Sequence, residues 1–499
     1  MKKLCFLLAL CLLLAGCGKP QPPKSPDCSA GHTDQNNDDL CDVCSQLMLV
    51  RFDIYAVNDL HGRLADTDFQ PGVDELSTYL KQAQQSGNTI LLSTGDMWQG
   101  TAEARLTGGF LITEWMNEMG FAAMTLGGHE YDWGEEQIRK NKELAQFPFL
   151  GINVYSRETD TRVDYCQSSL VIEQNGVQVG MIGAMGDCQA PEGVYFKTGS
   201  ELTALVKAEA EKLRKEGADF IIYTIHDGYD QTTTDTQALA VTQQDIASYY
   251  DTTLSDGYVD LVFEADSHYW YLLTDQHGIS HLQAGGNNQG ISHVTVMINQ
   301  ANGNFTLLTT ELVSTGKYSY MEKDPMVDRL MEKYADEIAP AQTVLGTNNQ
   351  YRNNKALGQL VANLYCQAGM EKWGQEYDLV LGGGYIFCRS PGFMNAGPVT
   401  YGDLYSLLPF DNQIMLCSIQ GKDLISRFLE NDHYAYHIKT TEYGEGIREQ
   451  IDPDGTYYVV TDSYSANYAY NHMTVIDVYH DTVFARDLLA AHIAAGEMQ

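Results

Sequence analysis

Basic residues are scarce in this chain of 499 residues, which has 31 lysines and arginines against 66 aspartates and glutamates. The formal net charge of −35 repels the phosphate backbone of nucleic acids, so no nucleic-acid partner is expected. The same charge repels anionic small molecules at long range. A site for phosphate therefore needs a local positive centre, which a bound metal ion would supply.

Long hydrophobic runs are also lacking, and this excludes a chain that crosses the membrane several times. The run at 4–14 is too short to span a bilayer and is followed by Leu-Ala-Gly-Cys17. This order is typical of a lipoprotein signal peptide cleaved before Cys17. We expect residues 1–17 to be that signal, lipid on Cys17 to anchor an extracytoplasmic protein to a membrane surface, and residues 18–47 to form a tether.

The tether contains the pattern Cys28-x3-His32-x8-Cys41-x2-Cys44, which has the donor types of a structural zinc knuckle. Its interior, 34–42, also has the alternating oxygen donors of a calcium loop, without the usual glycine and glutamate. In an exported protein, a disulfide-linked spacer is the third interpretation. Each interpretation makes this segment a structural element.

Five cysteines lie in the rest of the chain, after residue 48. In an exported protein, Cys166 could pair with Cys188, or Cys366 with Cys388. Spacing alone does not decide between these pairings, and connectivity stays open.

From residue 51 onward, apolar runs rich in β-branched residues alternate with polar stretches of helical periodicity, which predicts a layered α/β fold. We expect a first domain over 48–320, a linker helix over 321–342 and a smaller α/β domain over 343–499. The predicted strands of the first domain are 52–57, 89–93, 121–126, 149–153, 177–184, 220–225, 259–263, 278–284, 293–299 and 305–314.

Histidines and aspartates follow several of these apolar runs, and they are Asp59, His61, Asp96, His129, His226 and His268. If the runs are parallel strands, these side chains gather at one carboxyl edge, where open α/β sheets bind ligands. A bridging carboxylate lets two divalent ions lie about 3.5–4 Å apart and polarise a phosphoryl group from both sides. Asp96 is the predicted bridge.

Three motifs carry a family resemblance: AVNDLHGR at 56–63, STGDMWQG at 93–100 and LGGHEYDWG at 126–134. They resemble the 5'-nucleotidase branch of the calcineurin-like metallophosphoesterases, and 404–421 resembles the C-terminal domain of the same family. The resemblance covers most of the chain. It implies a layered β-sandwich metallophosphoesterase domain flanked by helices, followed by a smaller α/β substrate-binding domain.

The resemblance also implies roles for individual residues. Asp59, His61, Asp96 and His268 match the ligands of the first metal. Asp96 and His226 match ligands of the second metal. His129 matches the histidine that stabilises the transferring phosphoryl group, and Asp132 matches the aspartate that orients its ring.

Two departures from the family affect the second metal. The family has asparagine at the position of Gly128 and histidine at the position of Asp266. Gly128 has no donor, so this metal should bind more weakly. Asp266 still offers oxygen, and an added carboxylate shifts the preference towards harder ions such as Mn²⁺, Mg²⁺ or Ca²⁺. The sequence does not decide between Mn²⁺, Mg²⁺, Zn²⁺ and Ca²⁺.

The C-terminal part departs as well, because the family's Asn-Gly-Gly-Gly-Ile-Arg is replaced by LGGGYIFCR at 381–389. The candidate substrate-binding residues are Gly383, Arg389 and Phe410, with Phe410 matching one aromatic of the family's base-stacking clamp. Tyr468 or Tyr470 is the candidate for the opposing aromatic. Aromatic faces stack on bases with little base preference, so a broad nucleotide site is implied.

The sequence thus predicts a metal-dependent phosphoester hydrolase that releases phosphate from nucleotides. The altered ligands leave a second hypothesis open: a surface-anchored nucleotide-binding or interaction protein with an impaired second metal site. The altered Gly383 loop leaves a third, a hydrolase of cyclic nucleotides or nucleotide sugars.

Overall fold

The computed structural model describes residues 28, 32–66, 71–186, 188, 190–229, 258–275, 277–386, 388–389, 391–429, 434–437, 451–469 and 472–498. The lipidation candidate Cys17 lies outside these residues. Among the helices of the described ranges, none has the length and apolar character needed to cross a membrane.

The first large sheet has the strand order β14-β13-β1-β2-β3-β4. Strands β1 to β4 are parallel, and β13 and β14 run antiparallel along one edge. The strands are β1 (Leu49–Val57), β2 (Thr89–Ser93), β3 (Ala123–Thr125), β4 (Phe149–Leu150), β13 (Gly290–Asn299) and β14 (Phe305–Ser314).

The second large sheet has the order β11-β12-β10-β9-β7-β6. Its four central strands are parallel, and an antiparallel strand closes each edge. The strands are β6 (Ser169–Gln174), β7 (Val177–Met185), β9 (Phe220–His226), β10 (Leu261–Phe263), β11 (Trp270–Thr274) and β12 (Ser280–Ala284).

The two sheets pack face to face, as the alternating directions of the side chains along β1 show. Phe52 and Ile54 enter a core shared with Phe220 and Phe263 of the second sheet. Tyr55 points the other way, into a core beneath the helices. Because side chains alternate along a strand, one apolar run covers both faces of its sheet.

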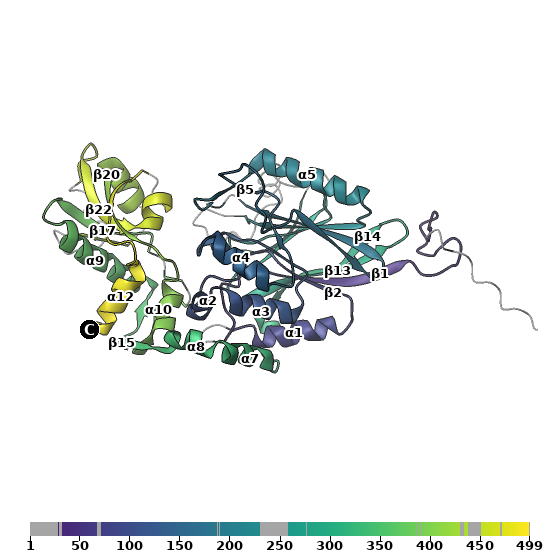
Figure 1. The fold of residues 1–499 in the computed structure, drawn as a ribbon, viewed down its shortest axis with the longest axis horizontal. Helices are drawn as coiled ribbons and strands as arrows, with labels where there is room; N and C mark the ends of the chain where they lie inside the picture. The colour runs from purple at the N-terminus through teal and green to yellow at the C-terminus, as the bar shows by residue number, and fades with distance from the viewer. Residues whose placement is uncertain are drawn as a thin grey trace, which may run out of the picture.

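Helices cover the outer faces of this sandwich (Figure 1). The first sheet is covered by α1 (Asp74–Gln84), α3 (Phe110–Met119) and α7 (Pro325–Lys333), which share one buried cluster with β1. The second sheet is covered by α5 (Gly199–Lys215). The resulting helix–sheet–sheet–helix layering confirms the predicted fold class.

The linker contains two helices where a single one is expected. Asp324 caps α7 by accepting a hydrogen bond from the Met326 N–H at 2.9 Å, and Pro325 takes the first helical position. Tyr334, with φ −103° and ψ 18°, ends α7 and separates it from α8 (Ala335–Ile338). The linker therefore bends, and α7 packs on the first sheet.

The C-terminal part has its own mixed sheet, of order β21-β17-β22-β20-β23, and its own buried cluster. The long helix α9 (Asn354–Trp373) and α12 (Ala485–Ala494) pack on this sheet (Figure 1). Its strands are β17 (Leu379–Gly384), β20 (Ile414–Gln420), β21 (Tyr434–His437), β22 (Thr456–Asp462) and β23 (Thr474–Val478). A short helix α11 (Gly421–Asp423) is continued by the π-helix Leu424–Leu429.

Short elements complete the described fold. They are α2 (Ala102–Leu106), α4 (Glu135–Leu144), α10 (Tyr401–Leu407), β5 (Val154–Ser156), β8 (Val194–Phe196), β15 (Val344–Asn348), β16 (Arg352–Asn353), β18 (Phe393–Met394), β19 (Gly397–Thr400) and the 3₁₀ turns Gly128–Tyr131, Thr315–Lys317 and Ala339–Gln342.

Stability should fall with rising pH because of the buried His281, which lies between Glu264 (2.8 Å) and Asp275 (3.5 Å). Burial opposes the imidazolium, but Glu264 and Asp275 prevail and raise the pKa of His281 to about 9. The stabilisation is complete below the unfolded pKa of about 6.5 and disappears as pH rises through about 9, a change on the order of 3 kcal/mol.

Urea denaturation between pH 6 and 10 measures the slope of the unfolding free energy against pH. The variant His281→Gln should flatten it, whereas His277→Gln, at an exposed position of the same hairpin, should keep it. Equal slopes in all three proteins would contradict the assignment.

Candidate functional site

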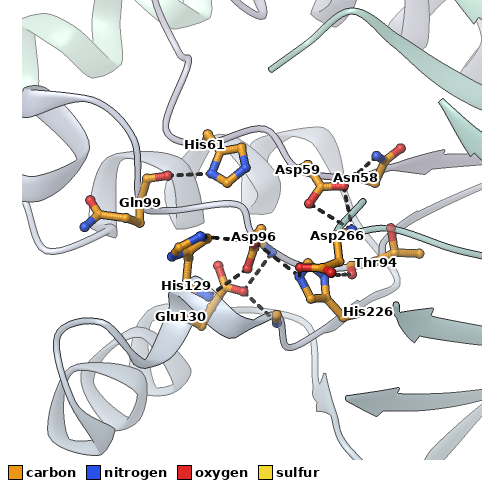
Figure 2. A network of polar contacts seen from close by, with 12 residues as sticks. Asn58, Asp59, His61, Thr94, Asp96, Gln99, His129, Glu130, His226 and Asp266 are labelled. Atoms are coloured by element: carbon orange, nitrogen blue, oxygen red, sulfur yellow. Dashed lines mark hydrogen bonds and ion pairs between the residues drawn. The ribbon is translucent and has the colours of Figure 1, made fainter. Parts of the chain in front are cut away.

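The candidate ligands gather where strands of both sheets end (Figure 2). Asp59 follows β1 and Asp96 follows β2, whereas His226 ends β9 and Asp266 follows β10. The loops after β1 and β2 are joined, because the Asp59 N–H donates to the Gly95 carbonyl at 3.0 Å. The sandwich packing therefore fixes the distance between donors from different sheets.

The backbone at these positions is unusual. Five of the candidate ligands have φ between +48° and +65°, and they are Asp59, His61, Asp96, Asp266 and His268. Non-glycine residues in this left-handed region cost about 1–3 kcal/mol each and concentrate at functional sites. The turns direct the side chains into one cluster.

The first donor group consists of Asp59, His61 and His268, with one ligand atom each within 4.8 Å of one another. His61 Nδ1 lies 2.9 Å from the Gln99 carbonyl, which can only accept, so Nδ1 carries the proton. The lone pair of His61 Nε2 then faces His268 Nε2 at 2.9 Å. Burial and the neighbouring His268 lower the pKa of His61 to about 3, which keeps the ring neutral, as metal ligation requires.

The second donor group consists of Asp59, Asp96 and His226. His226 Nδ1 lies 2.7 Å from the Thr94 carbonyl, and the buried Nε2 lies 3.2 Å from Asp96 Oδ2 without a well-directed hydrogen bond within the described chain. Burial opposes a charged ring, but Asp96 and then Asp59 prevail and raise the pKa of His226 well above its usual value. A cation bound beside these two carboxylates would take over this compensating charge and accept Nε2 as a ligand.

Asp59 belongs to both groups, whereas Asp96 belongs to the second group. Asp59 is therefore a second candidate for the bridging role that the sequence predicts for Asp96. Both side chains are almost fully buried, at 0% and 3% exposure. Two carboxylates in this position need compensating positive charge, so the donor set fits two divalent ions.

The two altered positions differ in their surroundings. Asp266 Oδ1 lies 3.8 Å from His226 Nε2, and the Asp266 N–H donates to Asp59 at 3.2 Å. At Gly128, a Cβ would meet its nearest atom, the Cys188 sulfur, only at 3.8 Å. A side chain at position 128 would therefore start without a clash, in ordinary van der Waals contact with Cys188.

His129 and Asp132 form the predicted pair, with His129 Nδ1 at 2.9 Å from Asp132 Oδ2. His129 Nε2 lies 3.9 Å from Asp96 Oδ2. Burial opposes the charged ring, but Asp132 and then Asp96 outweigh it and raise the pKa of His129 to about 9. The ring is an imidazolium at neutral pH and faces the second donor group.

The buried carboxylate of Glu130 holds the two loops together, a role that sequence reasoning missed. It accepts hydrogen bonds from the N–H groups of Gly127 (2.7 Å), Asp96 (2.8 Å), Met97 (2.8 Å) and Trp98 (3.2 Å). The 3₁₀ turn Gly128–Tyr131 and the loop after β2 are thereby fixed relative to each other. His129 and Asp96 owe their geometry to this carboxylate.

A cavity of about 250 Å³ opens beside the first donor group and is lined by both parts of the chain. The residues that face it include His61, Arg63, Gln99, His268, Asn287, Asn354, Arg389 and Phe410. Gln99 joins the two walls, because its amide donates to the Pro409 carbonyl at 3.2 Å and accepts from the Tyr405 hydroxyl at 3.0 Å.

Two arginines give this cavity positive charge. Arg63 is 5% exposed and donates to Asn287 Oδ1 at 3.0 Å, and Arg389 lies over the Phe410 ring at 5.0 Å. Among the described residues, neither guanidinium forms an ion pair with a carboxylate. Burial lowers the pKa of Arg63 to about 10, which leaves it charged at neutral pH. Arg63 is the last residue of the motif at 56–63, and this position was the sequence signal that could have placed it at the site.

The other candidate substrate-binding residues differ in where the structure places them. The Phe410 ring stacks on His129, with centroids 4.8 Å apart and an interplanar angle of 16°. Gly383 lies in β17, paired with Ala435, and does not face the cavity. Tyr468 lies in the π-helix Ser465–Ala469 without a described side chain, and Tyr470 lies outside the described residues.

The cysteines after residue 28 are free thiols in the described chain. The pairings considered for Cys166, Cys188, Cys366 and Cys388 are therefore absent from this structure. Burial raises the pKa of the Cys166, Cys366 and Cys388 thiols to about 12, so they are unreactive core residues. Cys28, His32, Cys41 and Cys44 lie together at the N-terminal end, away from this site.

The C-terminal part of the chain matches a known protein family. Residues 337–475 match the family described as 5'-nucleotidase, C-terminal domain. This match places the C-terminal part with the 5'-nucleotidases. The 5'-nucleotidase precursor of Thermus thermophilus aligns with a TM-score of 0.67 at 16% identity, over 89% of this chain and 96% of that one, and so shares the fold.

Several curated proteins match the chain at low identity. Endonuclease YhcR of Bacillus subtilis is 25% identical over 83% of this chain, which spans 37% of that protein's length. The apyrase of Tabanus yao is 24% identical over 83% of this chain and 85% of its own. The 5'-nucleotidase of Vibrio cholerae is 32% identical over 36% of this chain and 34% of its own.

The absence of a clash at Gly128 predicts that Gly128→Asn strengthens the second metal site. An amide oxygen there adds a ligand to Asp59, Asp96 and His226, and we expect Mn²⁺ to bind about tenfold more tightly or better. Calorimetric titration of metal-free protein measures the change. Gly316→Asn, at another uncrowded glycine, is the matched control. An unchanged affinity would show that this position faces no metal in this chain.

Proposed function

We propose that this protein is a metal-dependent phosphoester hydrolase that releases phosphate from nucleotides outside the cytoplasm. The observation that carries the proposal is the pair of donor groups sharing Asp59, with the imidazolium of His129 beside them. The match of residues 337–475 to the 5'-nucleotidase C-terminal domain supports the same reaction class. The extracytoplasmic location and the lipid on Cys17 rest on the sequence alone.

Metal binding and stabilisation of the phosphoryl group would fall to different residues of the site. Asp59, His61 and His268 would hold one divalent ion, and Asp59, Asp96 and His226 would hold the other, with Asp266 next to His226. Two bound divalent ions polarise a phosphoryl group and make bound water a nucleophile at neutral pH. His129 then donates a charged hydrogen bond to the phosphoryl oxygen on which negative charge develops, and Asp132 fixes its ring.

The arginines of the cavity provide for the substrate's anionic groups. Arg63 and Arg389 face the cavity without carboxylate partners among the described residues, so both remain available to phosphate oxygens. They offset locally the repulsion that a chain of net charge −35 exerts on an anion.

Phe410 supports a nucleotide in particular. It lies at the cavity, where its ring covers His129. Separation of Phe410 from His129 would free one aromatic face for the base and expose the imidazolium to the phosphate.

A second function, nucleotide binding without turnover, is favoured by one observation: Gly128 leaves the second donor group one ligand short. Hydrolysis of cyclic nucleotides or nucleotide sugars stays open as well, because Gly383 of the altered loop does not face the cavity.

Chromatographic analysis of the products formed by the purified full chain with Mn²⁺ tests these proposals, with AMP, ADP, a UDP-sugar and a cyclic nucleotide as substrates. AMP and ADP would release inorganic phosphate, whereas cleavage of the other two would first yield a nucleoside monophosphate. We expect turnover of a nucleotide, its loss in Asp96→Asn, and its retention in Asp160→Asn at an exposed turn. Stoichiometric nucleotide binding without release of phosphate would contradict hydrolysis and favour the binding function.

The role of His129 yields a separate kinetic prediction. His129→Gln should lower kcat about 10²–10³-fold and leave KM nearly unchanged, because the ring acts on charge that develops in the transition state. Asp132→Asn should lower kcat less, since it removes only the group that orients the ring. A rise in KM at constant kcat would mean that His129 binds substrate instead.

A further inference from the structure

Four metal-type donors lie together at the N-terminal end of the described chain. Cys28, His32, Cys41 and Cys44 each place one ligand atom within 4.8 Å of the others. The three cysteines are free thiols, and the Cys28 and Cys41 sulfurs are 3.8 Å apart, far beyond the S–S bond of about 2.0 Å. The disulfide-linked spacer is therefore absent from this structure.

The distances match a tetrahedral zinc site. With Zn–S about 2.3 Å and Zn–N about 2.0 Å, two sulfur ligands lie about 3.8 Å apart, and a sulfur and a nitrogen about 3.5 Å. The separation of the Cys28 and Cys41 sulfurs is 3.8 Å, and that of Cys44 Sγ and His32 Nδ1 is 3.5 Å.

The backbone around Cys41 holds this cluster in a closed turn. The Ser45 N–H donates to the Cys41 carbonyl at 2.8 Å, with Ser45 in the left-handed region at φ 57°. The Cys41 N–H donates to the Gln46 carbonyl at 2.8 Å.

The segment is fastened to the catalytic sandwich by the turn that joins β13 and β14. Asn299 donates to Asp34 Oδ2 at 2.6 Å and to Asp39 Oδ1 at 3.2 Å, and Asn302 donates to Asn37 Oδ1 at 3.0 Å. In Figure 1 this segment lies at the end of the molecule opposite the C-terminal part.

The calcium-loop alternative has less support. Asp34 accepts from the N–H groups of Asp38 and Asp39, Asp38 accepts from that of Leu40, and Asp42 accepts from that of Gln35. These carboxylates serve the local backbone. Within the described ranges they form no group with the spacing of metal ligands, whereas the thiols and the imidazole do.

We propose that Cys28, His32, Cys41 and Cys44 bind one structural zinc ion, which fixes the segment 32–48 to the turn between β13 and β14. The site is separate from the catalytic cluster and shares no residue with it. It gives the protein an ordered metal-bound unit within the tether predicted over 18–47.

Cobalt substitution of the full chain, purified under reducing conditions, tests the proposal. Thiolate-to-Co²⁺ charge-transfer absorption reports cysteine ligands, which the aspartate and histidine cluster cannot mimic. We expect this absorption in the wild type, its loss in Cys41→Ser and Cys44→Ser, and its retention in Cys366→Ser, at a buried free cysteine of the C-terminal part. One equivalent of zinc should be lost from the same two variants, with phosphoester hydrolysis little changed.

A measurement on the wild type covers the case in which these variants misfold. Removal of zinc by a chelator should add three maleimide-reactive thiols to the protein. The absence of charge-transfer absorption, an unchanged thiol count, or bound calcium in place of zinc would each overturn the proposal.

Discussion

The burial of two carboxylates next to each other is the constraint on which the site depends. Asp59 and Asp96 are almost entirely removed from solvent, in a chain that already carries a large negative charge. Such groups are tolerated in a protein interior only beside compensating charge. The surrounding imidazoles supply part of it, and two divalent ions would supply the rest at the position where a phosphoryl group needs them.

The sandwich makes this charge arrangement possible. The first sheet delivers Asp59 and Asp96, and the second delivers His226, Asp266 and His268, so the packing of the two sheets sets the spacing of the donors. Glu130 fastens two of the loops through four backbone N–H groups. The C-terminal part adds Arg389 and Phe410 and closes the cavity over His129.

The local pattern of apolar and polar residues predicted many of the strands. Continuous apolar runs marked the central strands, and β2 and β14 have the predicted bounds. The edge strands β6 and β11 were missed, because both are short and most of their residues stay partly exposed at the edge of the sheet. The linker bend was missed because it depends on the conformation of Tyr334, which composition does not show.

The motifs identified the metal ligands but not the contacts between them. His61 and His268 meet across 207 residues of chain, and Asp59 enters both donor groups only because the two sheets pack together. The sequence did not show that Arg63 and Asn287 contact each other and line one cavity, because the two residues are brought together only by the fold. The N-terminal cysteines left three interpretations open until the distances between their sulfurs and His32 were known.

Crystals grown with Mn²⁺ and measured at the manganese absorption edge test the central claim most directly. Two anomalous peaks about 3.5–4 Å apart are predicted, one among Asp59, His61 and His268 and one among Asp59, Asp96 and His226. A single peak, or manganese bound away from Asp59, would contradict the two-metal account.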